Sequence, residues 1–443
     1  MARSGIAAAR LLHEKGEYVI INDRKTEADF AGALDELRRD NIEWRLGEDA
    51  LDLLPLVNQV VISPGIPIEH PAVLRAQEMG IEVIGEVELA YRMSMGRVVA
   101  ITGTNGKTTT TTLLGEIFKN AGKRTFVVGN IGTPYAGIAA ESRADDVIVC
   151  EISSFQLETI DKYHPVVSAI LNITEDHLNR HHTMERYAQL KARVFENQKD
   201  DEGTVLNYDD PILREMAQSA MCKVVWFSRT QQPPFGAFVQ DGNIVFGTPD
   251  NARTICAVDE VYIPGPHNLE NALAATACAM QAGVPAAVIR HTLRTFTGVE
   301  HRIETVCVKK GVTFINDSKA TNPDSAIKAV ETMKKPTVLL LGGSEKHSDY
   351  TQMCKVICES GWICHAVTLG DTGEAIAQAL EKAGFANVHR TGHDFKETMY
   401  FAASLAEEGG NVLLSPACAS FDMFNDYEHR GAEFKRIARE MPD

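Results

Sequence analysis

The sequence predicts an α/β protein made of three consecutive blocks, each built on a mainly parallel sheet. Short runs of apolar and β-branched residues alternate along the chain with longer stretches of helical periodicity. This alternation recurs three times in 443 residues, a length that suggests about two to four domains. Strands separated by helices usually pair in parallel, so each block is expected to be a doubly wound sheet. We place the blocks at residues 1–93, 94–299 and 300–443.

The first block is expected to have a Rossmann-like topology that lacks its opening strand. Its helix "GIAAARLLHEKG" precedes the strand runs "EYVIIND", "QVVISPG" and "IEVIG", with a helical stretch expected between the first two. A dinucleotide-type fold begins with a strand that leads into a glycine-rich turn and a helix. Here "MARSG", at residues 1–5, already has the character of the end of that turn. We therefore expect the first strand to be missing from this chain.

The second and third blocks are predicted from further strand runs. The second block contains "VVAIT", "DDVIVCE", "VVSAILNI", "GTVLN" and "KVVWFS". A hairpin turn is expected at Asp241–Gly242, and a long Ala-rich helix is expected over 269–281. The third block contains "VTFIND", "TVLLLGG", "HAVTLGD" and "NVLLSPA", each followed by a helical stretch. The third block is thus expected to be Rossmann-like as well.

Composition narrows the class of function. Hydrophobic residues make up 44% of the chain and charged residues 23%, which is typical of soluble globular proteins. The net charge of −16 disfavours nucleic acid as the main partner. No apolar run approaches the length of a membrane span. The nine cysteines contain no C-x-x-C pair, and most sit in apolar strand or helix patterns, which favours buried structural thiols in a reducing cytosol. These features predict a cytoplasmic protein with small-molecule partners and neither a nucleic-acid nor a membrane partner.

The segment "VVAITGTNGKTTTTTLLGEIF" predicts a phosphate-binding loop between a strand and a helix. The glycine spacing is tighter than in the common G-x-x-x-x-G-K-[ST] pattern, but the strand–loop–helix context is the one that the motif requires. Glycines let backbone N–H groups face phosphates, Lys107 reaches the β- and γ-phosphates, and a hydroxyl of Thr108 or Thr109 can bind Mg²⁺. The predicted loop residues are Gly103, Thr104, Asn105, Gly106, Lys107, Thr108 and Thr109.

Acidic and imidazole side chains are expected at the same sheet edge. Glu151 ends one strand run, and His177 follows the next, which places both at the carboxyl ends of parallel strands. His177 and His181 have helical metal-pair spacing, but the glutamate of the zinc-protease H-E-x-x-H motif is absent, which disfavours a zinc hydrolase. By pattern alone, His181 and His182 are ordinary surface histidines, and Lys191 is a helix-surface lysine.

These motifs together resemble those of the Mur ligases, which build the bacterial cell-wall peptide. The resemblance rests on GTNGKTT, GNIG, EISSFQLE, LNITEDHLNRH, YAQLKARVF, PGPHNLENALAA, HRIE, NDSKATNP and SPACASFDMF, which occur in order through all three blocks. It implies the three-domain Mur ligase architecture with a central P-loop ATPase-type domain. The pattern is most similar to the branch of the family that adds D-glutamate to UDP-N-acetylmuramoyl-L-alanine (UDP-MurNAc-L-Ala).

The resemblance implies an ATP-dependent amide ligase of peptidoglycan precursor synthesis that works as a cytoplasmic monomer. ATP would phosphorylate a carboxylate to an acyl phosphate, which the amine of the incoming amino acid would attack. Two Mg²⁺ sites are implied, and Lys191 matches the family lysine that becomes carbamylated. The implied catalytic residues are Lys107, Glu151, His177 and Lys191, and the implied metal ligands are Thr108, Glu151, His177 and Lys191.

The resemblance also assigns the substrate residues. Beyond the loop, ATP would contact Asn268, Asn271, Arg302, Asp317 and Lys319. The UDP-sugar substrate would contact Arg3, Ser4, Asp23, Arg24, Gly65, Asn130 and His177. D-Glutamate would contact Thr321, Lys346, Ser420, Phe421 and Tyr427.

Four other functions fit parts of the sequence. A nicotinamide dehydrogenase fits the Rossmann-like opening but leaves the phosphate loop unexplained, and the full G-x-G-x-x-G pattern is absent. A P-loop GTPase lacks an N-K-x-D guanine motif. A ligase that adds glutamate to folate would share the ATP chemistry, although the uridine-site matches argue against it. A non-enzymatic ATP-binding module remains the last alternative.

Overall fold

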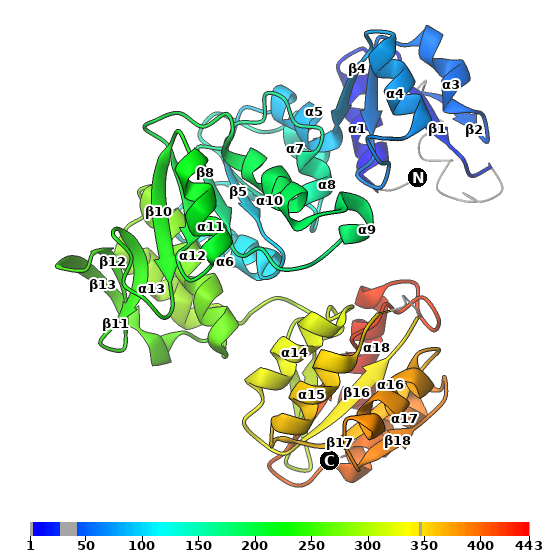
Figure 1. The fold of residues 1–443 in the computed structure, drawn as a ribbon, viewed down its shortest axis with the longest axis vertical. Helices are drawn as coiled ribbons and strands as arrows, with labels where there is room; N and C mark the ends of the chain where they lie inside the picture. Colours follow the sequence, from blue (N-terminus) through cyan, green and yellow to red (C-terminus); the bar gives the residue numbers. More distant parts are fainter. Residues whose placement is uncertain (1–2, 27–41, 345–347, 443) are drawn as a thin grey trace. The chain divides into compact units, whose positions relative to one another are not determined.

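The computed structural model describes residues 3–26, 42–344 and 348–442. The chain divides into two compact units (Figure 1), one of Met1–Tyr262 with Asn268–Phe296 and one of Ile263–His267 with Thr297–Asp443. Among the helices of the described residues, none combines the length and apolarity that crossing a bilayer requires.

The N-terminal part of the first unit contains two separate parallel strand pairs. Its elements are α1 (Arg3–Glu14), β1 (Ile20–Asp23), β2 (Glu43–Leu46), α3 (Ala50–Leu53), η3 (Leu54–Leu56), β3 (Gln59–Ile62), α4 (Pro71–Glu78), β4 (Glu82–Gly85) and α5 (Glu86–Met93). β1 pairs with β2, β3 pairs with β4, and α1 packs against both β1 and β3. In the stretch between the first two strand runs that was expected to be helical, β2 forms at Glu43–Leu46, whereas α3 and η3 are helical as expected. Residues 27–41 of that stretch lie outside the described part. Glu43, Trp44, Arg45 and Leu46 alternate between charged and apolar residues as a strand should, but the run is only four residues long and was grouped with the helical stretch. The expected loss of an opening strand concerns residues before Met1 and stays a prediction.

The rest of the first unit is built on a nine-stranded sheet. Its strands are β5 (Arg97–Thr102), β6 (Thr125–Gly129), β7 (Val147–Glu151), β8 (Val167–Ile170), β9 (Gly203–Asn207), β10 (Lys223–Ser228), β11 (Gly236–Gln240), β12 (Asn243–Thr248) and β13 (Asn251–Ala257). Their order is β13-β12-β11-β10-β9-β8-β5-β7-β6. In this order, all neighbouring strands between β11 and β6, including β5, pair in parallel. β11, β12 and β13 form an antiparallel meander. The predicted hairpin turn at Asp241–Gly242 joins β11 to β12, with both residues at positive φ.

Helices cover this sheet (Figure 1). They are α6 (Lys107–Asn120), α7 (Ala136–Ala139), α8 (Ser154–Leu157), α9 (Leu178–His181), α10 (Met184–Ala192), η4 (Arg193–Phe195), α11 (Pro211–Met216), η5 (Ala217–Ser219), η6 (Val258–Glu260), α12 (Pro266–Gln281) and α13 (Ala286–Thr295). One buried apolar cluster joins Val87 and Leu89 of α5 to Val98 of β5 and Ile148 of β7. The helix that precedes the sheet therefore shares its hydrophobic core.

The second unit is a six-stranded sheet with helices on both faces. Its elements are β14 (Glu304–Lys309), β15 (Val312–Asn316), α14 (Pro323–Thr332), β16 (Thr337–Gly342), α15 (Thr351–Glu359), β17 (Ile363–Leu369), α16 (Gly373–Lys382), β18 (Val388–Arg390), α17 (Phe395–Leu405), β19 (Asn411–Leu414) and α18 (Tyr427–Glu440). The strand order is β14-β15-β19-β16-β17-β18, and only β14 is antiparallel to its neighbour. Along β16, Leu339 and Leu341 pack in the cluster of α14, α15 and α16, whereas Val338 and Leu340 pack in the cluster of α17 and α18. The doubly wound prediction is therefore confirmed.

The order of the central strands positions the candidate site. β5 lies between β7 and β8, and all three are parallel. The phosphate loop after β5, Glu151 at the end of β7 and the segment that follows β8 therefore meet at one edge of the sheet. In parallel α/β sheets this carboxyl edge is where ligands bind.

Candidate active site

The phosphate loop needs glycine at two positions. Gly103 has φ 142° and Gly106, which caps the start of α6, has φ 85°. A Cβ atom on Gly106 would lie 2.3 Å from Oδ1 of Asn271, so a larger residue would displace that side chain. On the β8 side, the backbone N–H of Asn105 donates to Oδ1 of Asn172 at 2.8 Å, and Asn172 Nδ2 donates back to the Asn105 carbonyl at 3.1 Å. The loop is thus fixed between two asparagines before any nucleotide binds.

Two lysines converge on one carbonyl oxygen of this loop. Lys107 Nζ donates to the carbonyls of Gly103 at 2.9 Å and Thr104 at 2.7 Å, and Lys191 Nζ donates to the same Gly103 carbonyl at 2.8 Å. Lys191 is 1% exposed and its ammonium lies 4.6 Å from the ring centre of Tyr187. Burial, and then the charge of Lys107, hold the pKa of Lys191 well below its usual value. The pattern-based prediction of a helix-surface lysine is wrong, because α10 turns this residue toward the loop.

Glu151 carries a buried carboxylate oxygen that lacks a protein donor. Its side chain is 1% exposed, and Oε1 accepts a hydrogen bond from Asn130 Nδ2 at 2.9 Å. Within the described part of the chain, Oε2 has no hydrogen-bond partner, and neither does the buried hydroxyl of Thr109. Thr108, next to it, is half-buried. Because buried polar atoms are normally paired, the bare oxygens indicate that a cation or another ligand group belongs there.

The histidines near this edge differ from one another in burial. His177 is exposed, stands at the start of α9 with φ 53°, and its ring centre lies 4.8 Å from that of Phe155. His181 is fully buried and its ring centre lies 5.2 Å from that of Phe155, so its prediction as a surface histidine is wrong. Burial, and then the electrostatic effect of the neighbouring His177, lower the pKa of His181 to about 4, which keeps the His181 ring neutral near pH 7. His182 is exposed.

Two asparagines at the start of α12 meet the helix of the phosphate loop. Asn268 and Asn271 are both buried, and Asn271 Nδ2 donates to Asn268 Oδ1 at 3.2 Å. Thr110 of α6 donates its hydroxyl to Asn271 Oδ1 at 3.2 Å. The structure therefore brings these two predicted ATP residues to the loop.

The remaining predicted ATP residues lie in the second unit. Asp317 is 2% exposed and accepts hydrogen bonds from the Ser415 hydroxyl at 2.7 Å and from the backbone N–H of Ile303 at 3.2 Å. Burial raises the pKa of Asp317 to about 6, against the opposing charge of Arg302. Lys319 is half-buried two residues further along.

The residues predicted for D-glutamate come from separate segments of the second unit. Ser420 is buried and Phe421 is 72% exposed, both in the segment that follows β19. Thr321 lies before α14, Tyr427 begins α18, and both are half-buried. Lys346 lies outside the described residues, so its prediction is not addressed.

The residues predicted for the UDP-sugar lie at the start of α1 and at strand ends. Ser4 is in the first turn of α1 after Arg3, whose side chain lies outside the described part. Asp23 ends β1 and is followed by Arg24, whose Nη2 lies 2.7 Å from Nε2 of His70. Gly65, after β3, is exposed. The other two residues predicted for this substrate are Asn130 and His177, which lie near Glu151 and Phe155 as described above.

Sequence reasoning missed two residues that shape the site. Asn172 follows the apolar run of β8, so the strand-end argument applied to Glu151 and His177 would also have found it. Tyr187 contacts both lysine and loop, since its hydroxyl lies 3.2 Å from that of Thr104. No local pattern distinguishes this tyrosine from other apolar helix residues.

Comparison with known proteins agrees with this geometry. Three family models match the chain: the Mur ligase MurD-like N-terminal domain at residues 1–85, the Mur ligase middle domain at 101–279, and the Mur ligase glutamate ligase domain at 301–418. The UDP-N-acetylmuramoylalanine–D-glutamate ligase of Thermoanaerobacter sp. (strain X514) is 46% identical over 99% of this chain and 96% of its own length. The enzyme of the same name from Clostridioides difficile (strain 630) is 43% identical over 98% and 96%.

Solved structures share the fold at lower identity. MurF from Acinetobacter baumannii superposes with a TM-score of 0.64 at 16% identity, covering 98% of each chain. MurF ligase from Thermotoga maritima, solved in complex with ADP, gives 0.62 at 17% identity and covers 96% of each chain. The predicted three-domain architecture is thereby confirmed. With the full-length identity to the curated relatives, these matches show that the chain belongs to the Mur ligase family of ATP-dependent ligases.

Proposed function

We propose that this chain joins D-glutamate to UDP-MurNAc-L-Ala and cleaves ATP to ADP and phosphate. The observation that carries the proposal is the buried Glu151 oxygen that has no hydrogen-bond partner within the described residues, at the sheet edge that also carries the phosphate loop. The names and identities of the full-length relatives support the choice of substrates. Residues 1–93 would bind the UDP-sugar, 94–299 ATP, and 300–443 D-glutamate. The reaction would run in the bacterial cytoplasm on a monomer.

The chemistry requires an activated acid. A carboxylate is a poor electrophile, so ATP first phosphorylates it to an acyl phosphate. The amine of D-glutamate then attacks the acyl carbon, and the tetrahedral intermediate collapses to an amide and inorganic phosphate. The protein has to hold two anions in line and neutralise their charge. Backbone N–H groups at the start of α6 and the ammonium of Lys107 would do this at the γ-phosphate.

The residues at the sheet edge fit Mg²⁺. Carboxylate and hydroxyl oxygens are the ligands that this ion prefers, and Glu151 Oε2 and the Thr109 hydroxyl are buried without hydrogen-bond partners in the described part. Thr108, His177 and a modified Lys191 complete the proposed ligand set. Bound Mg²⁺ would supply positive charge against the phosphate and the substrate carboxylate. The sequence predicts the hydroxyl of Thr108 or Thr109 as a ligand of the ion, and the hydroxyl of Thr109, which is buried without a partner among the described residues, supports including it beside Thr108.

Carbamylation of Lys191 is also proposed. Only a neutral amine adds CO₂, and the lowered pKa of Lys191 favours the neutral form. The product carries an anionic carbamate, which would turn a residue that repels a cation into one that binds it. The proximity of Lys107 acts in the same direction, because both ammonium groups meet at the Gly103 carbonyl.

A substrate-omission assay tests the function. ADP release with ATP and Mg²⁺ should require both UDP-MurNAc-L-Ala and D-glutamate, and mass spectrometry should find the amide product. L-Glutamate serves as the control amino acid. When the substrate carboxylate carries ¹⁸O, one labelled oxygen should appear in the released phosphate. The proposal would be overturned if ADP were released at the same rate without D-glutamate, or if the new oxygen of the phosphate came only from water.

A further inference from the structure

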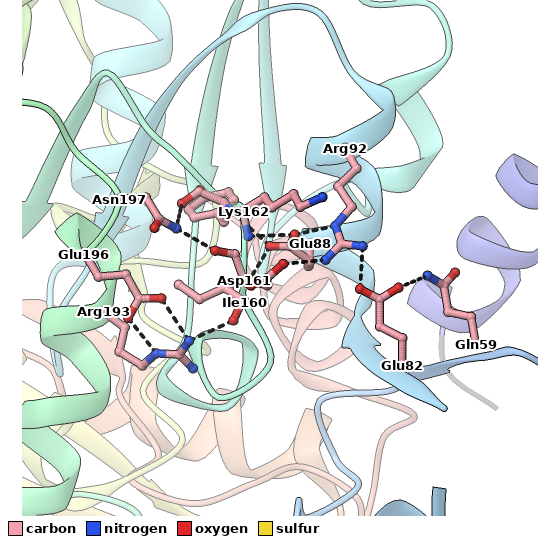
Figure 2. Close-up of polar contacts among 11 residues, drawn as sticks. Gln59, Glu82, Glu88, Arg92, Ile160, Asp161, Lys162, Arg193, Glu196 and Asn197 are labelled. Atoms are coloured by element: carbon pink, nitrogen blue, oxygen red, sulfur yellow. Dashed lines mark hydrogen bonds and ion pairs between the residues drawn. The ribbon is translucent and has the colours of Figure 1, made fainter. Parts of the chain in front are cut away.

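Helix α5 carries two buried carboxylates that hold two different loops of the nine-stranded sheet. Glu86 is 3% exposed and accepts a hydrogen bond from the backbone N–H of Ala136 at 2.6 Å. Glu88, two residues on, is fully buried. It accepts hydrogen bonds from three consecutive N–H groups, those of Asp161, Lys162 and Tyr163, each at 2.9 Å (Figure 2). Each carboxylate thus fixes the backbone of one loop, and the loop held by Glu86 follows β6 at the carboxyl edge of the sheet, where the candidate site lies.

The loop held by Glu86 is hydrogen-bonded to Glu151. It runs from the end of β6 to the start of α7, and is closed by a hydrogen bond from the Gly129 N–H to the Thr133 carbonyl at 3.3 Å. Within it, Asn130 donates its backbone N–H to the Glu151 carbonyl and its side chain to Oε1, both at 2.9 Å. The segment 129–136 is therefore anchored by Glu86 at one end and lies on Glu151 at the other.

The surroundings of Glu86 differ from those of Glu88. Glu86 lines a pocket together with Ser63, Pro64, Ile66, Phe155 and Gln156. The titratable groups that face it are Tyr135 and Cys150, and burial raises the pKa of both. Burial raises the pKa of Glu86 itself to about 7, opposed by the N–H groups of Ala136 and Tyr135. Glu88 accepts a hydrogen bond from Arg92 at 2.6 Å, whereas Glu86 accepts from the backbone N–H groups of Ala136 and Tyr135.

Building on the proposed function, we propose that Glu86 is a positioning residue of the ligation reaction: it fixes the 129–136 segment so that Asn130 holds Glu151 with Oε2 free to meet the metal and phosphate. The ionised carboxylate accepts the Ala136 N–H more strongly than the protonated acid does. The hold on the segment should therefore tighten as the pH rises through about 7.

Hydrogen exchange of the ligand-free protein tests the hold itself. In Glu86→Ala, the amides of Asn130 and Ala136 should exchange about tenfold faster, because the segment loses its anchor. Glu86→Gln keeps an acceptor oxygen and should restore most of the protection. Glu88→Gln is the matched control, which should speed exchange at 161–163 and leave 129–136 unchanged. Unchanged exchange at 129–136 in Glu86→Ala would overturn the proposal, whatever the protein's activity.

Kinetics test the consequence for catalysis. Glu86→Ala should lower kcat about tenfold and raise the Mg²⁺ concentration for half-maximal rate, while KM for D-glutamate stays unchanged. A purely structural role would lower thermal stability without moving the Mg²⁺ requirement. Glu86→Gln should recover kcat and lose the part of the rate that rises with pH near 7. If neither variant changes kcat or the Mg²⁺ requirement, Glu86 does not position the site, even though the wild type forms the amide.

The thermal midpoint gives an independent check. The folded pKa of Glu86 lies above the value of 4.5 expected for an unfolded chain, so the folded state binds more protons between these values. The stability that this adds is present below about 4.5 and is lost as the pH rises to about 7. The wild type should therefore lose thermal stability relative to Glu86→Gln across this range. A constant difference between the two midpoints would contradict the buried, weakly compensated environment on which the proposal rests.

Discussion

Two buried carboxylates of the first unit, Glu88 and Glu151, differ in how completely the protein supplies them with hydrogen-bond donors. Glu88 accepts four hydrogen bonds, three from backbone N–H groups and one from Arg92 at 2.6 Å (Figure 2). Glu151 accepts one from Asn130, and in the described part of the chain its second oxygen has none. Both side chains are almost entirely shielded from solvent.

In the loop that Glu88 holds, both backbone N–H groups and backbone carbonyls have side-chain partners. Its N–H groups point to Glu88, and Arg193 donates to the Ile160 carbonyl of the loop at 2.7 Å (Figure 2). Arg193 also donates to the carbonyl of Leu157, at the end of α8, at 2.7 Å. A buried charge is tolerated when its hydrogen-bonding capacity is filled, and costs free energy when it is not. Glu88, the filled carboxylate, whose hydrogen bonds are all made within the protein, therefore stabilises the fold. Glu151, the unfilled one, which lacks donors for its second oxygen in the described part, indicates where a ligand binds.

The largest effect is expected when the unfilled carboxylate is neutralised. Glu151→Gln should lower the rate of ADP formation by about a thousandfold, because the charge that faces the metal is lost. Thermal stability should stay the same or rise, since an uncompensated buried charge is removed. The measurement is single-turnover ADP release together with the thermal midpoint. A midpoint that falls as far as in Glu88→Gln would erase the proposed distinction between the two carboxylates.

The opposite pattern is expected at Glu88. Glu88→Gln should destabilise the protein by about 3 kcal/mol, because the charge that holds three N–H groups and Arg92 is lost. At temperatures where the variant is folded, ADP formation per molecule should stay within about threefold of wild type, since Glu88 does not touch the proposed reactants. Urea unfolding measures the first quantity and the ligation assay the second. Normal stability with lost activity would show that the filled carboxylate also acts in the reaction.

The features of the fold and site that could be predicted from sequence are those encoded by a short local segment. Strand runs such as "VIVCE" predict both the sheet and the position of Glu151 at its edge, because a carboxyl end of a parallel strand is a local feature with a fixed consequence. The phosphate loop is likewise local. β2 was missed although its residues alternate charged and apolar side chains, because a four-residue run is too short to be distinguished from the helical stretch around it.

Burial of single polar residues could not be predicted in the same way. Lys191 and His181 lie in a polar helical segment whose pattern is that of a surface helix, yet both are buried. What buries them is the packing of α9 and α10 against the loop and α8, which depends on contacts far apart in sequence. The role of Glu86 follows from such contacts too, since its partner Ala136 is 50 residues away.

The smallest expected effect compares two asparagines, one beside each carboxylate. Asn130 donates to Glu151 Oε1 at 2.9 Å, whereas Asn197 donates to the carbonyls of Asp161 at 2.8 Å and Tyr163 at 3.0 Å in the loop held by Glu88. Asn130→Ala should raise the Mg²⁺ concentration for half-maximal ADP formation about threefold to tenfold, because Glu151 loses its orienting donor but water can replace part of the bond. Its thermal midpoint should hardly change.

Asn197→Ala is the matched control, because it removes a donor from the filled site. It should lower stability by about 1 kcal/mol and leave the Mg²⁺ requirement unchanged. Equal shifts of the Mg²⁺ requirement in the two variants would mean that both loops act on the metal through general loosening of the first unit. A shift confined to Asn130→Ala would place the orienting contact on the one carboxylate whose second oxygen the protein leaves without a donor.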